Sequence, residues 1–163
     1  MKKVFFLAAL LVCSIAAQAQ RFALVDMEYI LKQIPAYEQA NQQMESLSKQ
    51  WQSEVEAKAQ EAKTMYDEYQ KNASNLSATQ KTAQENAIIA KEKEAADLRK
   101  KYFGPEGEGM KKRQELITPI QDAIYNAIKD IATQKNYDAV IDRASAQSMI
   151  FASPRIDISN EVL

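Results

Sequence analysis

The chain has 163 residues, of which 21 are Lys or Arg and 22 are Asp or Glu, so its formal net charge is −1. Because the charge is nearly balanced, a nucleic-acid partner is not expected. With no histidine, three glycines and 26% charged residues, the composition is typical of long polar helices rather than of a compact enzyme.

The first residues have the pattern of a secretory signal peptide. Two lysines precede the apolar run Val4–Ala17, and Ala17-Gln18-Ala19 is the small-x-small pattern that a signal peptidase reads. A run of about 14 residues is shorter than the roughly 20 that a membrane-spanning helix needs. We therefore expect cleavage after Ala19 and a periplasmic location, with no transmembrane segment in the remaining chain. Cleavage would remove the only cysteine, Cys13, and change the net charge from −1 to −3.

The segment after the expected cleavage site predicts a strand and a short helix. Phe22–Val25 is an apolar, β-competent run, and Met27–Leu31 has helical spacing that continues to Ile34. Pro35 is then expected near the first position of the next helix, where its missing N–H needs no partner.

A long helix is predicted from Tyr37 to Leu76, because neither Gly nor Pro interrupts these residues. Apolar or small side chains recur mostly at steps of three or four, which is a heptad-like stripe. The stripe consists of Tyr37, Ala40, Met44, Leu47, Trp51, Val55, Ala62, Met65, Tyr69 and Leu76. We expect it to drift after Trp51 and to be interrupted by Lys58. A helix of this length spans about 60 Å and cannot belong to a globule.

The chain is expected to reverse within Asn72–Thr79, which is rich in turn-forming and cap-forming residues. Ser77 and Gln80 have the spacing of a capping box, which begins a new helix. The return helix carries a thinner seam, in which the aliphatic stem of Lys91 is expected to lie along apolar neighbours. Its members are Ile88, Lys91, Ala95, Leu98 and Tyr102.

All three glycines of the protein lie between Gly104 and Gly109, together with Pro105. These residue types break helices, and we interpret Gly104, Pro105, Gly107 and Gly109 as a hinge. A phosphate-binding loop is disfavoured because the segment is acidic and lacks the Lys-Ser/Thr ending of that motif.

Helix is expected to resume at Met110 and to carry the strongest apolar face of the chain. Thr118-Pro119 predicts a kink in it, and Asn136 suits a helix end in the left-handed conformation. Tyr137–Asp142 and Met149–Ala152 are then predicted as the two strands of a hairpin. Together with Phe22–Val25 they would form a small sheet built from both ends of the chain.

The predicted fold class is mainly α with a small β-sheet. A long antiparallel helical-hairpin arm of coiled-coil type, residues 37–116, would project from a small α+β oligomerisation body, residues 20–36 and 117–163. The tip of the arm is expected near 72–79 and a break at 104–109. Because one seam buries little apolar area and the sheet has open edges, we expect a homo-oligomer that forms through the strands. The residues predicted for this contact are Phe22, Leu24, Val25, Val140, Ile141, Ile150 and Phe151.

Adaptable apolar side chains on the outgoing helix are candidates for binding other polypeptides. Methionine adapts its shape to a partner, and Tyr and Trp combine an apolar face with a polar edge. The candidates are Met44, Trp51, Met65, Tyr66 and Tyr69. The alternative is that this stripe only packs the two helices of the arm. Even then, we expect Tyr66 to face away from the partner helix.

The whole chain after the signal peptide resembles the OmpH family of periplasmic chaperones. The segments that carry this resemblance are Phe22–Met27, Leu116–Asp122, Ile131–Asp142 and Ile156–Val162. The resemblance implies a trimer whose strands form a central body and whose three helical hairpins surround a cavity. It also implies an ATP-independent holdase for unfolded outer-membrane β-barrel proteins. This chain is mildly acidic where familiar members are strongly basic, which argues against lipopolysaccharide binding through clustered basic residues. Peripheral contact with a membrane surface is left open.

The residues also bear on two other classes of function. An enzyme is not expected, because without histidine only carboxylates could act as acid and base, and those near strand ends usually cap helices or face water. These are Asp26, Glu28, Asp138, Asp142 and Asp157. No cofactor or metal is expected either. The remaining alternative is a non-catalytic coiled-coil envelope adaptor with one specific protein partner.

Overall fold

The structure is a computed structural model that describes residues 21–146 and 148–163. The expected signal peptide, residues 1–19, lies outside the described residues. The elements in chain order are β1 (Phe22–Val25), α2 (Met27–Gln33), α3 (Pro35–Asn72), η1 (Ala73–Asn75), α4 (Ala78–Phe103), α5 (Glu108–Lys135), β2 (Ala139–Asp142), η2 (Pro154–Ile156) and α6 (Ser159–Val162). The fold is therefore mainly α with a small sheet, as the sequence predicted.

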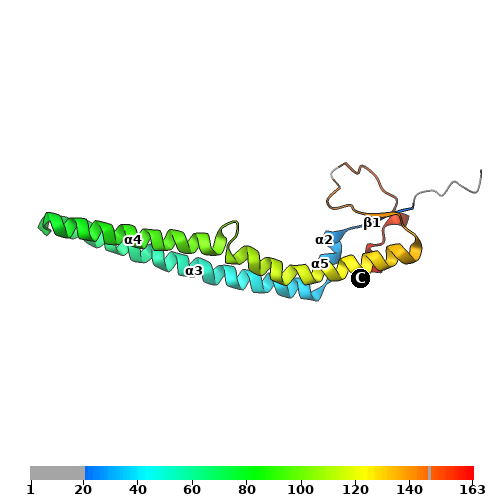
Figure 1. Ribbon diagram of the computed structural model, residues 1–163, viewed down its shortest axis with the longest axis horizontal. Helices are drawn as coiled ribbons and strands as arrows, with labels where there is room; N and C mark the ends of the chain where they lie inside the picture. Colours follow the sequence, from blue (N-terminus) through cyan, green and yellow to red (C-terminus); the bar gives the residue numbers. More distant parts are fainter. Residues whose placement is uncertain (1–20, 147) are drawn as a thin grey trace, which may run out of the picture. The chain divides into compact units, whose positions relative to one another are not determined.

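These elements form two compact units. One unit contains β1 and α2 together with Asp122–Leu163, and the other is Pro35–Gln121. The second unit contains the helical hairpin, in which α3 and α4 run side by side in opposite directions (Figure 1). We call Pro35–Gln121 the arm and the other unit the body.

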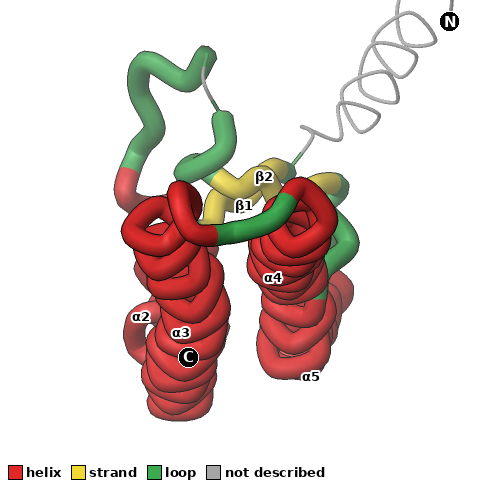
Figure 2. Tube along the Cα trace, turned by 90° about the vertical axis from the view of Figure 1, so that its left-hand side faces the viewer, coloured by secondary structure: helices red, strands yellow, loops and turns green. Residues whose placement is uncertain are grey.

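Helix α3 begins at Pro35, as predicted, but ends at Asn72 rather than at Leu76. The predicted end was wrong because residues 73–75 tighten into the 3₁₀ turn η1, and the Asn72 side chain donates to the Glu68 carbonyl at 3.0 Å. Figure 2 looks onto this end of the hairpin and shows the short connection that crosses from α3 to α4. Four residues that could have been helical therefore form the reversal.

The predicted capping box at the start of α4 is confirmed. The Gln80 backbone N–H donates to the Ser77 hydroxyl at 3.4 Å, and the Ser77 backbone N–H donates to the Gln80 side-chain oxygen at 2.9 Å. Two N–H groups at the helix end thus receive partners without any tertiary contact. The reversal of the chain is encoded locally.

Helix α5 includes Pro119 and continues on both sides of it. Its apolar stripe buries Ile117 and Ile124. The helix ends before Asn136, whose φ of 53° is the left-handed conformation predicted for this residue. The Tyr137 N–H then donates to the Ala132 carbonyl at 2.9 Å, which satisfies one of the last carbonyls of the helix.

The sheet has two strands, β1 and β2, which pair in parallel from Phe22 opposite Ala139 to Val25 opposite Asp142. The predicted hairpin of 137–142 with 149–152 is wrong for this chain, and Ile150 and Phe151 do not lie in a strand. The second edge of β1 is occupied instead by Asp157, which bridges to Leu24, and by the Ile158 N–H, which donates to the Leu24 carbonyl at 2.9 Å. A parallel pair needs a long crossover, and helices α2 to α5 provide it.

The core of the body is built around β1. Ala23, Leu24 and Val25 are at most 3% exposed, and Ile30 of α2 and Ile158 next to α6 are 0% and 5% exposed. Because neighbouring strand residues point to opposite faces, burial of three in succession means that both faces of β1 are covered. This central position explains why the strand is apolar throughout.

Candidate functional site

The seam of the arm is a regular heptad repeat from Trp51 to Tyr69. The residues of α3 that are buried or half-buried along it are Trp51, Val55, Lys58, Ala62, Met65 and Tyr69, at steps of four, three, four, three and four. The expectation that the stripe drifts after Trp51 was wrong. Lys58 does not interrupt the seam, because its ammonium group turns to Glu61 at 3.1 Å while its stem remains half-buried.

The seam of α4 follows the predicted pattern. Ile88 and Ala95 are buried, and Lys91 is half-buried with its ammonium group 2.8 Å from Glu94 and 3.7 Å from Glu61 of α3. The hydrogen bond to Glu94, followed by the charges of Glu94 and Glu61, raises the pKa of Lys91. The hydrogen bond from Lys58 lowers the pKa of Glu61. A small charge network therefore links the two helices at the margin of a thin apolar seam.

An aromatic cluster joins the helices in the middle of the arm. The ring of Trp51 stacks on that of Tyr102 with centroids 5.1 Å apart, and Phe103 meets Trp51 edge-to-face at 6.4 Å. The Tyr102 hydroxyl donates to the Glu54 carboxylate at 2.5 Å, which raises the pKa of Tyr102. Sequence analysis placed Trp51 and Tyr102 on their stripes but missed Phe103, whose position directly before the first glycine was the available signal.

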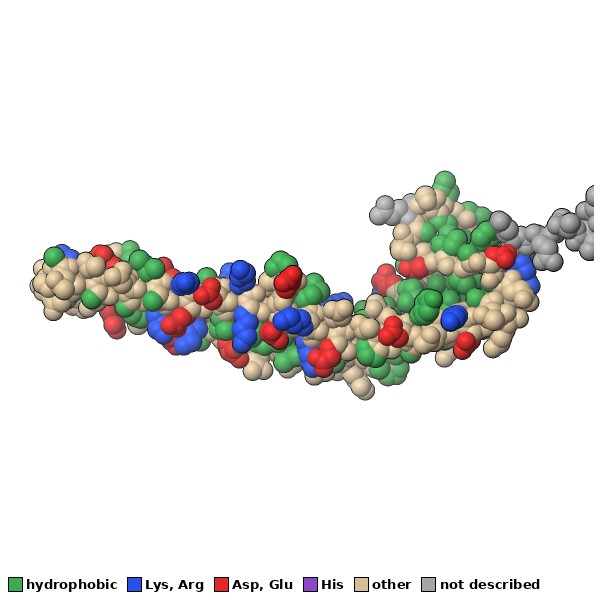
Figure 3. Space-filling view, viewed as in Figure 1, with side chains coloured by type: hydrophobic (Ala, Val, Ile, Leu, Met, Phe, Trp, Pro, Cys, Tyr) green, Lys and Arg blue, Asp and Glu red, His purple; other side chains and the backbone are tan. Residues whose placement is uncertain are grey.

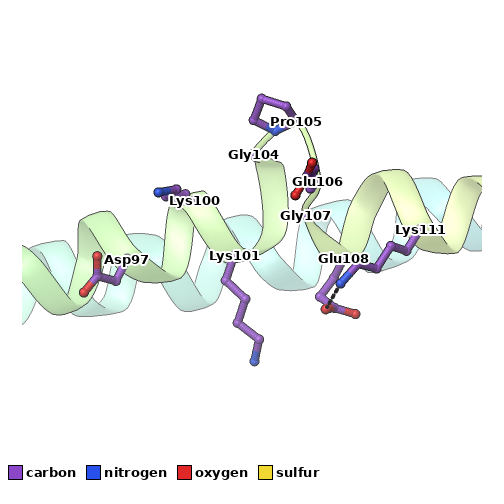
Figure 4. Close-up of a pocket in the computed structure, with 9 residues that line it drawn as sticks. All are labelled: Asp97, Lys100, Lys101, Gly104, Pro105, Glu106, Gly107, Glu108 and Lys111. Carbon is purple, nitrogen blue, oxygen red and sulfur yellow. Dashed lines mark hydrogen bonds and ion pairs between the residues drawn. The ribbon is translucent and has the colours of Figure 1, made fainter.

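The glycine-rich segment connects α4 to α5 as a small bulge (Figure 4). Its last glycine, Gly109, lies beside Trp51 of the aromatic cluster. An open hollow of about 500 Å³ lies around it, lined by three acidic side chains, three lysines and the loop itself. These residues are Asp97, Lys100, Lys101, Gly104, Pro105, Glu106, Gly107, Glu108 and Lys111. Acidic and basic groups balance in it, so its charge does not select an anion or a cation.

The five candidate binding residues fall into two groups. Tyr66 is 47% exposed, as predicted, and therefore faces away from the seam. Met44, Trp51, Met65 and Tyr69 are half-buried within the seam or its margin. The Tyr69 hydroxyl donates to Glu85 of α4, and this hydrogen bond raises the pKa of Tyr69. Trp51 and Tyr69 thus take part in packing the arm, whichever further contacts they make.

Met65 borders a shallow hollow between α3 and α4 close to the reversal. Its volume is about 210 Å³, and Ala87 and Ile88 form its apolar wall while Glu68, Asn72 and Gln84 form its polar rim. Beyond Ala62, no residue of α3 is fully buried among those that the structure describes. The seam is therefore loosest near the reversal, where an adaptable methionine borders it.

Three exposed apolar side chains on the arm were missed by sequence analysis. Ile89, Phe103 and Met110 are 60%, 43% and 56% exposed. Ile89 directly follows the buried Ile88, so a helical wheel places it outside the seam. An apolar residue one position outside a heptad stripe was the signal that could have identified it.

The body also exposes apolar side chains. Ile150 and Phe151 are 100% and 84% exposed in the loop after β2, and Phe22 and Ile141 of the sheet are 44% and 41% exposed. Of the other residues predicted for oligomer contact, Leu24 and Val25 are buried inside the body and Val140 is half-buried. The exposed members are thus the ones that remain available for a partner.

The carboxylates at the strand ends have structural partners. Asp26 caps α2 by accepting from the Tyr29 N–H at 2.8 Å, and Arg143 donates to it from Nη2 at 3.0 Å. Asp157 accepts from the Ser159 hydroxyl at 2.6 Å and pairs with Arg143 Nη1 at 3.2 Å. The buried Ser159 hydroxyl in turn accepts from the Asp26 N–H at 2.8 Å. We call Asp26, Arg143, Asp157 and Ser159 the clasp of the body.

The remaining acids near the strands act similarly. Asp138 accepts from the Arg21 N–H at 2.7 Å, and Asp142 accepts from the Met27 N–H at 3.2 Å. Glu28 pairs with Lys32 one turn along α2 at 2.5 Å. The acids considered for catalysis therefore cap or pair, as expected of residues at strand ends.

Among residues 21–146 and 148–163, no helix is long and apolar enough to cross a membrane. Within the same residues, no group of three or more Cys, Asp or Glu side chains is arranged to hold a metal ion.

Comparisons with known proteins agree with this architecture. Residues 21–163 match the family model described as "Outer membrane protein (OmpH-like)". The chaperone protein Skp of Yersinia enterocolitica is 29% identical over 155 residues, which are 94% of this chain and 90% of that protein. Skp of Photorhabdus luminescens is 30% identical over 127 residues, covering 78% of this chain and 75% of that protein.

A solved structure of an OmpH-like protein from Caulobacter crescentus has a similar fold. Its TM-score is 0.70 over 86% of this chain and 80% of that chain. At 11% sequence identity, this likeness shows the fold alone.

Proposed function

The chain belongs to the OmpH-like outer membrane protein family, and from this premise we propose that it is an ATP-independent periplasmic holdase chaperone. In this proposal, residues 1–19 direct export and are cleaved after Ala19. The protein then binds unfolded outer-membrane β-barrel proteins and prevents their aggregation before membrane insertion. It is not an enzyme and needs no cofactor.

The observation that carries the proposal is the pattern of exposed apolar side chains on a thinly packed arm. Tyr66, Ile89 and Met110 are 47%, 60% and 56% exposed, each on a helix of the arm that also exposes many charged side chains. Each exposed side chain can bury only a modest apolar area against a client. Burial stabilises the contact by about 25 cal/mol per Å² of that area. Contacts of this kind are individually weak and accept many sequences, which suits a holdase.

Charged side chains separate these apolar contacts. Figure 3 shows acidic and basic groups interspersed along the helices between apolar side chains. Several form pairs within one helix, such as Lys49 with Glu45 at 2.6 Å and Lys63 with Asp67 at 2.8 Å. Such pairs keep the exposed faces soluble and helical, and we propose that they prevent permanent adhesion of a client.

We further propose that the protein is a homotrimer whose arms surround the client in a cavity. The three-fold stoichiometry follows from the family resemblance alone. Support for self-association comes from the body, which leaves Ile150 and Phe151 almost fully exposed although both are large and apolar. Exposed apolar clusters of this kind mark protein interfaces. The proposal includes no nucleic-acid partner, because acidic residues outnumber basic ones.

The decisive experiment dilutes a urea-denatured outer-membrane β-barrel protein into buffer with and without purified residues 20–163. Light scattering reports aggregation, and sedimentation counts the subunits in the free protein and in the complex. Suppression that saturates near one oligomer per client is the expected result. Unchanged aggregation in the presence of a stable oligomer would refute the holdase.

A single-partner envelope adaptor remains the second candidate, because the regular seam from Trp51 to Tyr69 is the feature expected of such a coiled coil. The two functions differ in selectivity. A holdase suppresses aggregation of several unrelated β-barrel proteins at similar ratios, whereas an adaptor leaves all of them to aggregate.

A further inference from the structure

The glycines at the α4–α5 connection are not required for backbone conformation. None of the three has a positive φ, and Gly104 has φ −67° and ψ 165°, which any residue can adopt. Free rotation is the usual reason to regard a glycine-rich segment as a hinge. A different physical reason is needed for glycine at these positions.

The reason is lack of space. A Cβ atom added to Gly104 would lie 2.4 Å from the Lys100 carbonyl oxygen, and one added to Gly107 would lie 2.7 Å from that of Lys101 and 2.8 Å from that of Tyr102. A Cβ on Gly109 would lie 2.9 Å from the Tyr102 oxygen and 3.5 Å from the Trp51 ring. These neighbours are mostly backbone atoms, which cannot move aside as a flexible side chain can.

The segment is also closed by hydrogen bonds. The Gly104 N–H donates to the Lys100 carbonyl and the Gly107 N–H donates to the Gly104 carbonyl, both at 2.9 Å. The Lys111 N–H donates to the Gly107 carbonyl at 3.2 Å and begins α5. Gly107 is buried, whereas Pro105 and Glu106 at the tip of the bulge are exposed. Only the tip therefore has the freedom of a surface loop.

The bulge occupies almost one helical turn. Four residues, 104–107, separate the last residue of α4 from the first of α5, and one turn contains 3.6 residues. An insertion of this length leaves the apolar stripes on either side nearly in phase. Gly109 consequently returns to the seam beside Trp51, the residue on which Tyr102 already stacks.

In place of the hinge expected from the glycine content, we propose that Gly104–Gly107 is a locked one-turn insertion that joins α4 rigidly to α5. The carbonyl groups at the end of α4 pack closely against the glycines of the insertion. Trp51 of α3 packs against Tyr102 and Phe103 on one side of the insertion and against Gly109 on the other. The arm then moves as one body through the bulge. This inference is independent of the proposed function, since it concerns only the rigidity of the arm.

Alanine substitutions at the glycines distinguish a hinge from a locked joint, because they should raise the stability of the protein in the first case and lower it in the second. At a hinge with permissive φ, Gly→Ala stabilises slightly, because alanine restricts the unfolded chain. At a packed joint it destabilises, because the new methyl group displaces a carbonyl. We therefore expect Gly107→Ala and Gly109→Ala in residues 20–163 to lower Tm by about 3 °C or more. Glu106→Ala, at the exposed tip, is the matched control and should leave Tm unchanged.

An unchanged or raised Tm for Gly107→Ala would overturn the locked joint. If a glycine variant fails to fold, hydrogen exchange on the unaltered protein decides the question. The amides of Gly104, Gly107 and Lys111 should exchange at rates close to those of amides in the middle of α4. Exchange of these three amides at the rate of an unstructured peptide would show a hinge.

Discussion

Tyr102 on α4 lies nearly parallel to Trp51 on α3, with ring centroids 5.1 Å apart and an interplanar angle of 11°. The same tyrosine donates its hydroxyl to Glu54, also on α3. Stacking on the ring face and hydrogen bonding at the hydroxyl of one side chain thus hold the two helices together beside the glycine bulge.

The Trp51–Tyr102 pair should contribute measurable coupling to arm stability. In a double-mutant cycle of Trp51→Ala and Tyr102→Ala, we expect a coupling of about 1 kcal/mol, since aromatic pairs contribute about that much beyond area burial. Urea unfolding of residues 20–163 followed by circular dichroism gives the free energies. The control cycle pairs Trp51→Ala with Tyr66→Ser, which should be additive. Additivity in the first cycle would mean that the stack adds nothing beyond burial.

The exposed apolar residues should matter for client binding more than for stability. Tyr66→Ser and Ile89→Ser should each weaken suppression of aggregation while changing the unfolding free energy by less than about 0.5 kcal/mol. Trp51→Ser should lower both the suppression of aggregation and the unfolding free energy, because Trp51 also packs the arm. Gln60→Ser, an exposed polar change on α3, is the control. Full suppression by the Tyr66 and Ile89 variants would exclude these residues as contacts.

Loss of the capping box should destabilise the reversal of the arm. Ser77→Ala removes the acceptor for the Gln80 N–H and should lower the unfolding free energy by about 1 kcal/mol. Thr79→Ala is the control, because Thr79 is an exposed residue in the same first turn of α4. Thermal unfolding of both variants is the measurement, and equal Tm values would contradict the prediction.

The clasp predicts a loss of body stability in acid. The Tyr29 N–H, with further help from Arg143, holds the pKa of Asp26 below its ordinary 3.8. Burial raises the pKa of Asp157, but hydrogen bonds from Ser159 and the charge of Arg143 outweigh it, so this pKa also lies below 3.8.

A carboxyl group whose folded pKa is lowered stabilises the protein above its unfolded pKa, and this stability is lost as pH falls through the folded value. Urea unfolding should therefore show a decline below about pH 4. Asp26→Asn should lower stability at pH 7 and make this decline shallower. The same pH slope in the variant and the parent would show that Asp26 does not contribute.

The exposed loop of the body should govern assembly. Ile150→Ser together with Phe151→Ser should shift sedimentation toward the monomer at micromolar concentration, because both side chains lie outside the core and are free to pack on another copy. Ser148→Ala in the same loop should leave assembly unchanged. An unaltered oligomer in the double variant would place the interface elsewhere.

Several features of the arm and of the end of α5 could be predicted because their determinants are local. The capping box at Ser77, the glycine break and the left-handed Asn136 each depend on residues within a few positions of one another. The outward direction of Tyr66 followed from helical spacing. These features require only the helical period, and the structure reproduces them.

Other features were decided by contacts that sequence spacing does not contain. The propensity of Met149–Ala152 is that of a strand, but β1 has β2 on one edge and Asp157–Ile158 on the other, so no edge of β1 remains for this segment. The glycines indicated a break, whereas only the structure shows that Gly109 of α5 lies against α3, where an added Cβ would be 3.5 Å from the Trp51 ring. Likewise, the clasp joins residues more than 100 positions apart.

Helical periodicity, caps and turn chemistry are properties of neighbouring residues, and the sequence by itself determined them. Pairing partners, free strand edges and the contact of Gly109 with Trp51 depend on segments that are distant in the chain, and only the tertiary structure decided them. The physical reason is that backbone propensity acts within a few residues, whereas packing excludes one segment by the presence of another.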